Sequence, residues 1–372
     1  MKMKYILFFF ILLAVSSCTD AIYENINIRQ NSTFKCKFAL SFSGEKIFSP
    51  DGNTPSNWMN TFISQSDSAY WVLYNSYSGE LNNFDLLTQK EICKKQLPVK
   101  NTDGIAFCEG KFYIQDYKYA QFFRVDSLCQ VDTIAVWRAE NYRIPPSRIG
   151  IFNGVYSHNN LKYIVTYTMG EYDDEHRKIC MEYDELNRKV KYYVNYPEFY
   201  AKANWGQSSY RTVYSCYNPS ANSIIFSFPA SHNVVSFNCQ TKYITEFYAG
   251  SSEIRSIKAY SNKKSQIKDA ESVEHYLRNN SYGPVFFDKY RKLFYRIAEM
   301  PYTANDGSLY KSKSIIILDM DLNVIGESLL GPYYGNAVLI EPEGILVPYI
   351  NSEWNMDKPM VYHCFRLKLV EK

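Results

Sequence analysis

The chain has 372 residues, of which 46% are hydrophobic and 21% are charged, so it can bury a large core and is not disordered over most of its length. Its 41 basic and 38 acidic residues give a net charge of +3, which is too balanced for the electrostatic footprint of a nucleic-acid-binding protein. Aromatic residues reach 17%, and because Tyr and Phe favour pleated strands, the composition favours an all-β fold.

The N-terminus has the features of a bacterial lipoprotein signal. Two lysines precede an apolar run over residues 5–15, which is too short to span a bilayer but has the length of a signal-peptide core. The run ends in Val15-Ser16-Ser17-Cys18, the pattern at which a lipoprotein precursor is cut and its Cys acylated. Several acyl chains on Cys18 would give a stable anchor. The sequence predicts a signal peptide over residues 1–17, a lipidated Cys18 and a tether over 18–33. An ordinary secretory signal is the alternative.

From about residue 58 the chain consists of short strand-like runs separated by turn signals. The runs form groups of four, and the last group has three; the groups cover residues 59–98, 104–137, 150–197, 212–248, 283–330 and 335–369. The third run of a group ends in an apolar residue followed by Asp or Asn, at positions 85, 126, 184, 238 and 319. Those side chains accept hydrogen bonds from nearby backbone N–H groups in turns. A repeat of about 40–50 residues with insertions is typical of a β-propeller.

The last group lacks a fourth run, while residues 34–43 alternate with period two and belong to no group. We expect this N-terminal strand to complete the last blade, which ties the two ends of the ring and removes an open edge. The sequence therefore predicts one six-bladed β-propeller domain over residues 34–372. Seven blades are the alternative if the insertion at 249–282 contains strands. In that insertion, the spacing of Ile267, Ala270, Val273 and Leu277 predicts a short amphipathic helix.

Nine cysteines are present, and Cys18 is one of them. The other eight are expected to be free thiols, because most lie in apolar runs and a chain of this size does not need disulfides to fold. A Cys36–Cys364 disulfide on neighbouring strands is the alternative. The sequence has no CxxC pair and no Cys/His cluster, so it predicts no metal site, and no cofactor is expected.

Three segments together resemble a known family: Val15-Ser16-Ser17-Cys18, Leu81-Asn82-Asn83-Phe84-Asp85-Leu86 and Gly110-Lys111-Phe112-Tyr113-Ile114-Gln115-Asp116. With them the sequence resembles lipoproteins of Bacteroidetes-type bacteria that carry a domain of unknown function, number 4221. The resemblance covers nearly the whole mature chain, and the insertion at 249–282 departs from it. It implies a six-bladed propeller-like fold and a surface location, and it implies no reaction.

In a propeller, the connections between blades share one face with the loops between second and third strands. The longest predicted insertions fall on this loop-rich face, where function usually resides. Arg143 and Arg148 flank a stiff Pro-Pro element and suit carboxylates or phosphates. Trp205, Tyr210 and Arg211 combine an aromatic face with hydrogen-bond donors and suit a glycan or a peptide. The alternatives are a rigid connector with solvated arginines and a Trp that caps a blade junction.

These patterns predict a lipid-anchored propeller of the outer membrane, on its periplasmic or cell-surface side, that binds a glycan, a peptide or an envelope protein. No GxSxG, HExxH or phosphate-binding loop is present, so no catalytic residue is predicted. Two alternatives stay open. A hydrolase or lyase acting on glycans or peptides would show a coupled acid–base pair at the channel mouth. A structural subunit of an outer-membrane complex would show a large exposed apolar patch.

Overall fold

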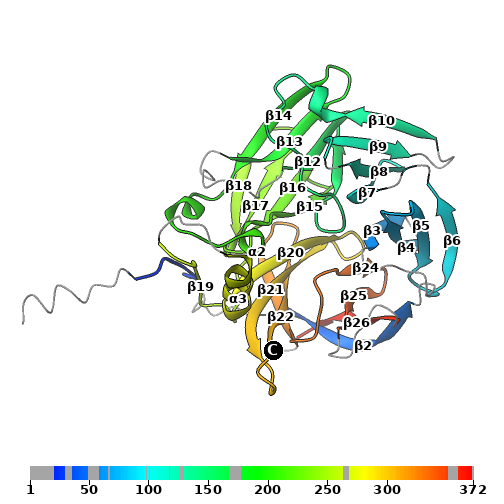
Figure 1. The fold of residues 1–372 in the computed structure, drawn as a ribbon. Helices are drawn as coiled ribbons and strands as arrows, with labels where there is room; N and C mark the ends of the chain where they lie inside the picture. The colour runs from blue at the N-terminus through cyan, green and yellow to red at the C-terminus, as the bar shows by residue number, and fades with distance from the viewer. Residues whose placement is uncertain are drawn as a thin grey trace, which may run out of the picture.

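The computed structural model describes residues 21–29, 36–48, 58–65, 68–97, 99, 101–116, 118–125, 130–166, 177–262, 268–350 and 359–370. Over these ranges the chain is mostly β, with two short α-helices, α2 (Ser208–Arg211) and α3 (Asp269–Arg278). The strands form sheets arranged around an axis, as Figure 1 shows. No helix in the described ranges is long and apolar enough to cross a bilayer.

Four sheets each contain four consecutive antiparallel strands and form blades 1–4. Blade 1 contains β3 (Trp58–Gln65), β4 (Ser68–Asn75), β5 (Glu80–Asp85) and β6 (Glu91–Gln96). Blade 2 contains β7 (Gly104–Cys108), β8 (Lys111–Asp116), β9 (Gln121–Val125) and β10 (Val131–Ala135). Blade 3 contains β11 (Val155–His158), β12 (Leu161–Val165), β13 (Lys178–Asp184) and β14 (Lys189–Asn195). Blade 4 contains β15 (Tyr214–Asn218), β16 (Ser223–Ser227), β17 (Asn233–Asn238) and β18 (Ile244–Tyr248).

Blades 5 and 6 join edge to edge in one eight-stranded sheet. Blade 5 contains β20 (Ser281–Asp288), β21 (Leu293–Thr303), β22 (Leu309–Leu318) and β23 (Val324–Gly331). Blade 6 contains β24 (Leu339–Glu341), β25 (Gly344–Pro348) and β26 (Met360–Leu369), and its fourth strand is the N-terminal β2 (Phe38–Phe48). The predicted closure by an N-terminal strand is confirmed, although the strand begins at residue 38 and extends to 48. The described part of the insertion at 249–282 adds only α3 and the three-residue β19 (Ser256–Lys258). The seven-bladed alternative is therefore wrong.

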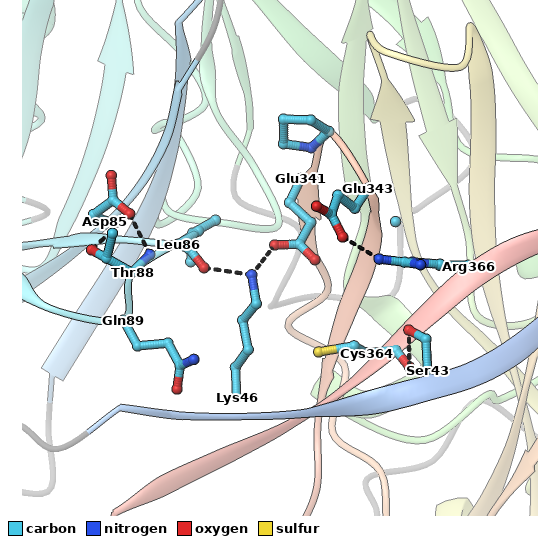
Figure 2. Close-up of polar contacts among 12 residues, drawn as sticks. Ser43, Lys46, Asp85, Leu86, Thr88, Gln89, Glu341, Glu343, Cys364 and Arg366 are labelled. Atoms are coloured by element: carbon cyan, nitrogen blue, oxygen red, sulfur yellow. Dashed lines mark hydrogen bonds and ion pairs between the residues drawn. The ribbon is translucent and has the colours of Figure 1, made fainter.

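Polar contacts reinforce the closure between blades 6 and 1 (Figure 2). Lys46 on β2 donates from its Nζ to Glu341 Oε2 at 2.5 Å in blade 6 and to Leu86 O at 2.6 Å in blade 1. The Lys46 and Glu341 side chains are only 14% and 7% exposed. The pair thus lies where the first and last blades meet, and loss of either partner would leave a buried charge.

The Asp and Asn residues that mark the third strands act as the sequence predicts. Asp85, Asp184, Asn238 and Asp319 each accept backbone N–H groups of the following turn; for example, Thr88 N donates to Asp85 Oδ1 at 2.6 Å. The fifth marker, residue 126, lies outside the described ranges. These turns fix the register between the third and fourth strands of a blade.

The seven described cysteines are all free, as expected: Cys36, Cys93, Cys108, Cys180, Cys216, Cys239 and Cys364. The register of β2 on β26 places Cys364 opposite Gly44, eight positions from Cys36. The alternative Cys36–Cys364 disulfide is therefore wrong. Cys18 and Cys129 lie outside the described residues.

Helix α3 confirms the predicted helical insertion, but it buries a different face. Val273 is 52% exposed, whereas Ser272 is buried and accepts a hydrogen bond from Gln207 N at 2.9 Å. Tyr276 packs against the core and donates to Glu299 Oε2 at 2.7 Å. Polar contacts, and not the predicted apolar stripe, hold this helix against blade 5.

The stretch predicted as a tether is partly folded. Residues 21–29 lie against the propeller, and β1 (Glu24–Ile26) pairs antiparallel with β19. Asn27 is buried, and its Nδ2 donates to Ser251 O at 2.9 Å and to Ile254 O at 3.0 Å. This segment lies on the outside of the ring, beside blades 4 and 5 (Figure 1).

Candidate functional site

The two predicted arginines lie on the connection between blades 2 and 3. Arg143 is exposed, and its backbone N–H donates to Tyr192 Oη at 3.0 Å. The Arg148 side chain is 66% exposed, and its Nη2 lies 3.4 Å from Asp103 Oδ1. Neither arginine lines the cavities described below. Their ligand-binding role stays a prediction.

Trp205, Tyr210 and Arg211 lie together, but they are buried. Trp205 is 1% exposed, its Nε1 donates to Phe199 O at 3.3 Å, and its ring contacts Phe199, Tyr200 and Tyr210. Tyr210 Oη donates to Asn280 O at 2.7 Å. The expectation of an aromatic face open to a ligand is wrong for Trp205, because helix α2, helix α3 and the N-terminal segment cover this region. Its surroundings match the alternative, a Trp that caps a blade junction.

A cleft of about 880 Å³ lies between blades 3 and 4, on the predicted loop-rich face. Its floor is one face of the β17–β18 ladder, where Asn233 pairs with Tyr248 and Val235 pairs with Glu246. One wall is the end of blade 3, residues 194–199, and the other is the N-terminal segment, residues 25–29. We name this cavity the blade 3–4 cleft.

The lining of the blade 3–4 cleft is mixed. Phe199 and Tyr248 supply aromatic surface, and Asn233 Nδ2 donates to Glu246 Oε2 at 3.1 Å. Further polar and charged groups come from Asn25, Arg29, Asn195, Glu198, Ser231 and His232. A cavity of several hundred Å³ with aromatic surface and a few fixed polar groups is typical of a ligand site. Its three asparagine amides and its charged groups suit a polar ligand.

His232 closes the inner end of the cleft and is held neutral. Its Nδ1 lies 2.8 Å from Tyr282 Oη, and its Nε2 lies 2.9 Å from Asn25 O. Burial, with a smaller effect from the Arg296 guanidinium, lowers the pKa of His232 to about 4, although the Asn25 contact opposes this. Both ring nitrogens are used, so His232 positions the N-terminal segment and is not poised as a general base.

Val194 lines the same cleft in a strained conformation. It has a φ of 59° and is 1% exposed. A positive φ is rare for a β-branched residue and costs about 1–3 kcal/mol. Such strain is concentrated at functional sites, and here it lies where β14 ends and turns along the cleft wall.

A turn lies between two smaller cavities. The first strands of blades 2–6 surround a cavity of about 340 Å³ with a mainly apolar and aromatic lining, including Phe107, Tyr156 and Phe287. A second cavity of about 240 Å³ lies beside Phe152 and blade 6. Ile151 lines the first and Phe152 the second, and Phe152 O accepts a hydrogen bond from Ser215 N at 2.9 Å. The turn at residues 150–153 therefore separates the two cavities.

A buried ionic cluster lies where α3 meets blade 5. Glu299, Lys311 and Lys313 are 1%, 6% and 8% exposed. Burial alone would raise the pKa of Glu299, but the two lysines and hydrogen bonds from Tyr276 and Asn336 outweigh it and lower the pKa to about 2. Burial lowers the pKa of Lys311 to about 8. These three charged groups line none of the three cavities, and the Lys311 Nζ lies 4.3 Å from the Tyr276 ring centroid. The cluster therefore secures α3.

The cleft lies on the loop-rich face that the sequence predicts, but most of its lining residues were not predicted. Only Glu198 and Phe199 lie in one of the long connections between blades that the sequence places on this face. Asn25 and Arg29 were missed because nothing in the sequence indicates that the segment after the signal peptide pairs with the propeller. The signal that could have identified it is the alternation of Ile22, Glu24, Ile26 and Ile28 with Tyr23, Asn25 and Asn27.

Comparisons with known proteins agree with this fold. A family model, a domain of unknown function (DUF4221), matches residues 37–329. A solved structure of a DUF4221 family member from Bacteroides vulgatus matches with a TM-score of 0.73 and 16% identity, over 90% of this chain and 100% of that chain. Virginiamycin B lyase from Staphylococcus aureus matches with a TM-score of 0.41 and 10% identity, over 90% of this chain and 100% of the lyase chain. The β-propeller domain of Cps50 (Swd1) from Myceliophteria thermophila has a TM-score of 0.41 and 9% identity, over 87% and 99%. At 16% identity, the similarity to the Bacteroides vulgatus structure concerns the fold alone. No curated protein matches the sequence.

Proposed function

The chain belongs to the DUF4221 family, a family of β-propellers of unknown function, and we propose that it is a lipid-anchored propeller of the cell envelope that binds an extended polar ligand. The proposed site is the blade 3–4 cleft, and the proposed ligand is a peptide or a glycan. The location is the outer membrane, on either its periplasmic or its cell-surface side.

The anchor is supported by the pattern Val15-Ser16-Ser17-Cys18 after an apolar run. Acylation of Cys18 would place the membrane at the start of the folded chain, since Ala21 is already bonded to the propeller through Asn262 Nδ2 at 2.9 Å. The N-terminal lipid is thus the proposed membrane partner.

The composition of the cleft carries the binding proposal. It brings Arg29, Glu198 and Glu246, three amides and three aromatic side chains into one cavity of about 880 Å³. Peptides and glycans present amides, hydroxyls and apolar edges that such a surface can match. The central cavity is smaller and mainly apolar, so it is a poorer match for a polar ligand.

The hydrolase or lyase alternative has less support. His232 is the histidine that lines the cleft, and both of its ring nitrogens are engaged. Glu198 and Glu246 also line it, but Glu246 accepts its hydrogen bond from Asn233 Nδ2, and the two ring nitrogens of His232 contact Tyr282 and Asn25. A coupled acid–base pair is therefore not found among the residues lining this cleft.

Isothermal titration of the purified chain against panels of envelope-derived peptides and oligosaccharides tests the binding site. Ile244 lies in the cleft on the fourth strand of blade 4 and is 48% exposed. Ile244→Trp should fill part of the cleft and weaken binding about tenfold or more, a loss of about 1.4 kcal/mol. The matched control is Val131→Trp, on the fourth strand of blade 2, where the native residue is 39% exposed. Equal affinities for the two variants would show that the ligand binds elsewhere.

A further inference from the structure

The N-terminal segment has two chemically distinct faces. Tyr23, Asn25 and Asn27 face the propeller, whereas the isoleucines at alternate positions face outward. Ile22, Ile26 and Ile28 are 49%, 59% and 88% exposed, and together we call them the isoleucine stripe. Large β-branched side chains at such exposure, three on one face of one short segment, indicate a surface that contacts something other than water.

The inward face holds this segment firmly in place. Asn25 Nδ2 donates to Ala230 O at 2.6 Å, and the Tyr23 ring lies edge-on to Trp205 at 5.8 Å. Two backbone hydrogen bonds add to these contacts: Asn27 N donates to Arg255 O at 2.8 Å, and Ala259 N donates to Tyr23 O at 2.9 Å. The isoleucine stripe is therefore presented by a docked strand and has a fixed orientation relative to blades 4 and 5.

The distance to the lipid anchor is short. Ala21 is three positions after Cys18, and a fully extended chain covers at most about 3.6 Å per residue, or about 11 Å over these three steps. Ala21 is fixed to Asn262, because Asn262 Nδ2 donates to Ala21 O and Tyr23 N donates to Asn262 Oδ1 at 2.8 Å. An acylated Cys18 would therefore hold this corner of the propeller within about 11 Å of the lipid surface.

Among the exposed charges at the end of the segment and beside it, Arg29 and Arg255 outnumber the acidic Glu253. Glu24 is the acidic residue among the outward-facing positions, and Lys258 Nζ pairs with its Oε1 at 3.2 Å. Arg29 and Arg255, at the end of the segment and beside it, are exposed. Basic residues next to an apolar stripe favour contact with a bilayer that contains anionic lipids.

We infer that the isoleucine stripe rests on the outer membrane surface and orients the propeller with the edge of blades 4 and 5 against the bilayer. This inference depends on the proposed acylation of Cys18. Ile26 and Ile28 also border the blade 3–4 cleft, so the cleft opens beside the membrane. The isoleucine stripe thus contacts the lipid surface, and a ligand would enter the cleft next to the membrane.

Fluorescence quenching on vesicles tests the orientation. The full-length lipidated protein is reconstituted in phosphatidylethanolamine and phosphatidylglycerol vesicles that contain brominated phosphatidylcholine, as Ile22→Trp, Ile28→Trp and Leu186→Trp variants. Leu186 is the matched control, because it is 85% exposed but lies in the turn after β13. Relative to the unsubstituted chain, the new Trp at positions 22 and 28 should be quenched about twofold more than the Trp at 186, since the bromine atoms are on the acyl chains and quench only a ring that inserts at the headgroup and acyl boundary.

The possible outcomes distinguish a wrong orientation of the propeller from the absence of the lipid anchor. Flotation of the same vesicles reports anchorage, and Cys18→Ala should stay out of the vesicle fraction. If the chain floats but positions 22 and 28 are quenched no more than 186, the orientation is wrong and the anchor stands. Sedimentation as a dimer, with the stripe unquenched, would assign the stripe to a second copy and also overturn the inference. If the intact chain does not float, the anchor and the orientation both fail.

Discussion

At the scale of single residues, Trp205 and Arg148 show why burial decides a role that residue type alone leaves open. Both lie in loops on one face, and both suit ligand contact by their chemistry. In the structure the Trp205 ring is 1% exposed among other aromatic rings, and the Arg148 side chain is 66% exposed. The sequence could place these residues on the loops, but the N-terminal segment that covers Trp205 comes from about 180 residues away, beyond the reach of local patterns.

These two residues should respond differently to truncation. Trp205→Ala should lower the free energy of unfolding by about 3–5 kcal/mol, because it leaves a cavity under α2 and α3. Arg148→Ala should change it by less than about 1 kcal/mol, because its pair with Asp103 is solvated. Urea unfolding followed by circular dichroism measures both. A small loss for Trp205→Ala would show that the ring is not part of the core.

At the scale of secondary-structure elements, the blades were predictable and the additions to them were not. Period-two alternation recurs in the blades and the Asp or Asn turn marker in five of the six, so together they identify strands and their grouping. Helix α3 was found, but its buried face is set by partners on blade 5 such as Glu299, which helical spacing cannot reveal. The closing strand β2 was recognised because one blade lacked a strand.

The Lys46–Glu341 pair tests the closure. Lys46→Met should lower the free energy of unfolding by about 3 kcal/mol, because it leaves the nearly buried Glu341 carboxylate without its partner. The double variant Lys46→Met/Glu341→Met should recover most of that loss, since no buried charge then remains. Urea unfolding of the two single variants and the double variant gives the coupling energy. A double variant that is no more stable than Lys46→Met would show that the pair does not contribute to closure.

At the scale of the whole molecule, the cleft joins segments that are distant in sequence. Asn25 and Ala230 are 205 positions apart and hydrogen-bonded, and His232 lies between the N-terminal segment and blade 5. A repeat pattern predicts blades but not what fills the space between two of them, so the ring was predictable and the cleft was not.

The buried histidine predicts a pH dependence of stability. The pKa of His232 is lowered from 6.5 to about 4 in the folded chain, so the unfolded chain binds the proton more readily. The contribution of the neutral His232 to the free energy of unfolding is complete above pH 6.5 and is lost as the pH falls toward 4. This loss amounts to about 2 kcal/mol between pH 7.5 and pH 5. His275, whose pKa burial also lowers to about 4, adds a loss of the same sign. Urea unfolding measures the free energy of unfolding at pH 7.5 and at pH 5. The difference between the two values should be about 2 kcal/mol smaller in His232→Gln than in the unsubstituted chain. An unchanged difference would show that His232 does not titrate in this way.

The membrane anchor and the orientation of the propeller both depend on lipidation at Cys18, and mass spectrometry of the mature N-terminus tests it most directly. The protein is purified from membranes of a bacterium that processes lipoproteins and is digested, and its N-terminal peptide is identified. Lipidation at this residue predicts a peptide that begins at Cys18 and carries a thioether-linked diacylglycerol, with a further acyl chain on its amine. A mature chain that begins at another residue, or that carries an unmodified Cys18, would contradict both the anchor and the membrane-facing orientation of the propeller.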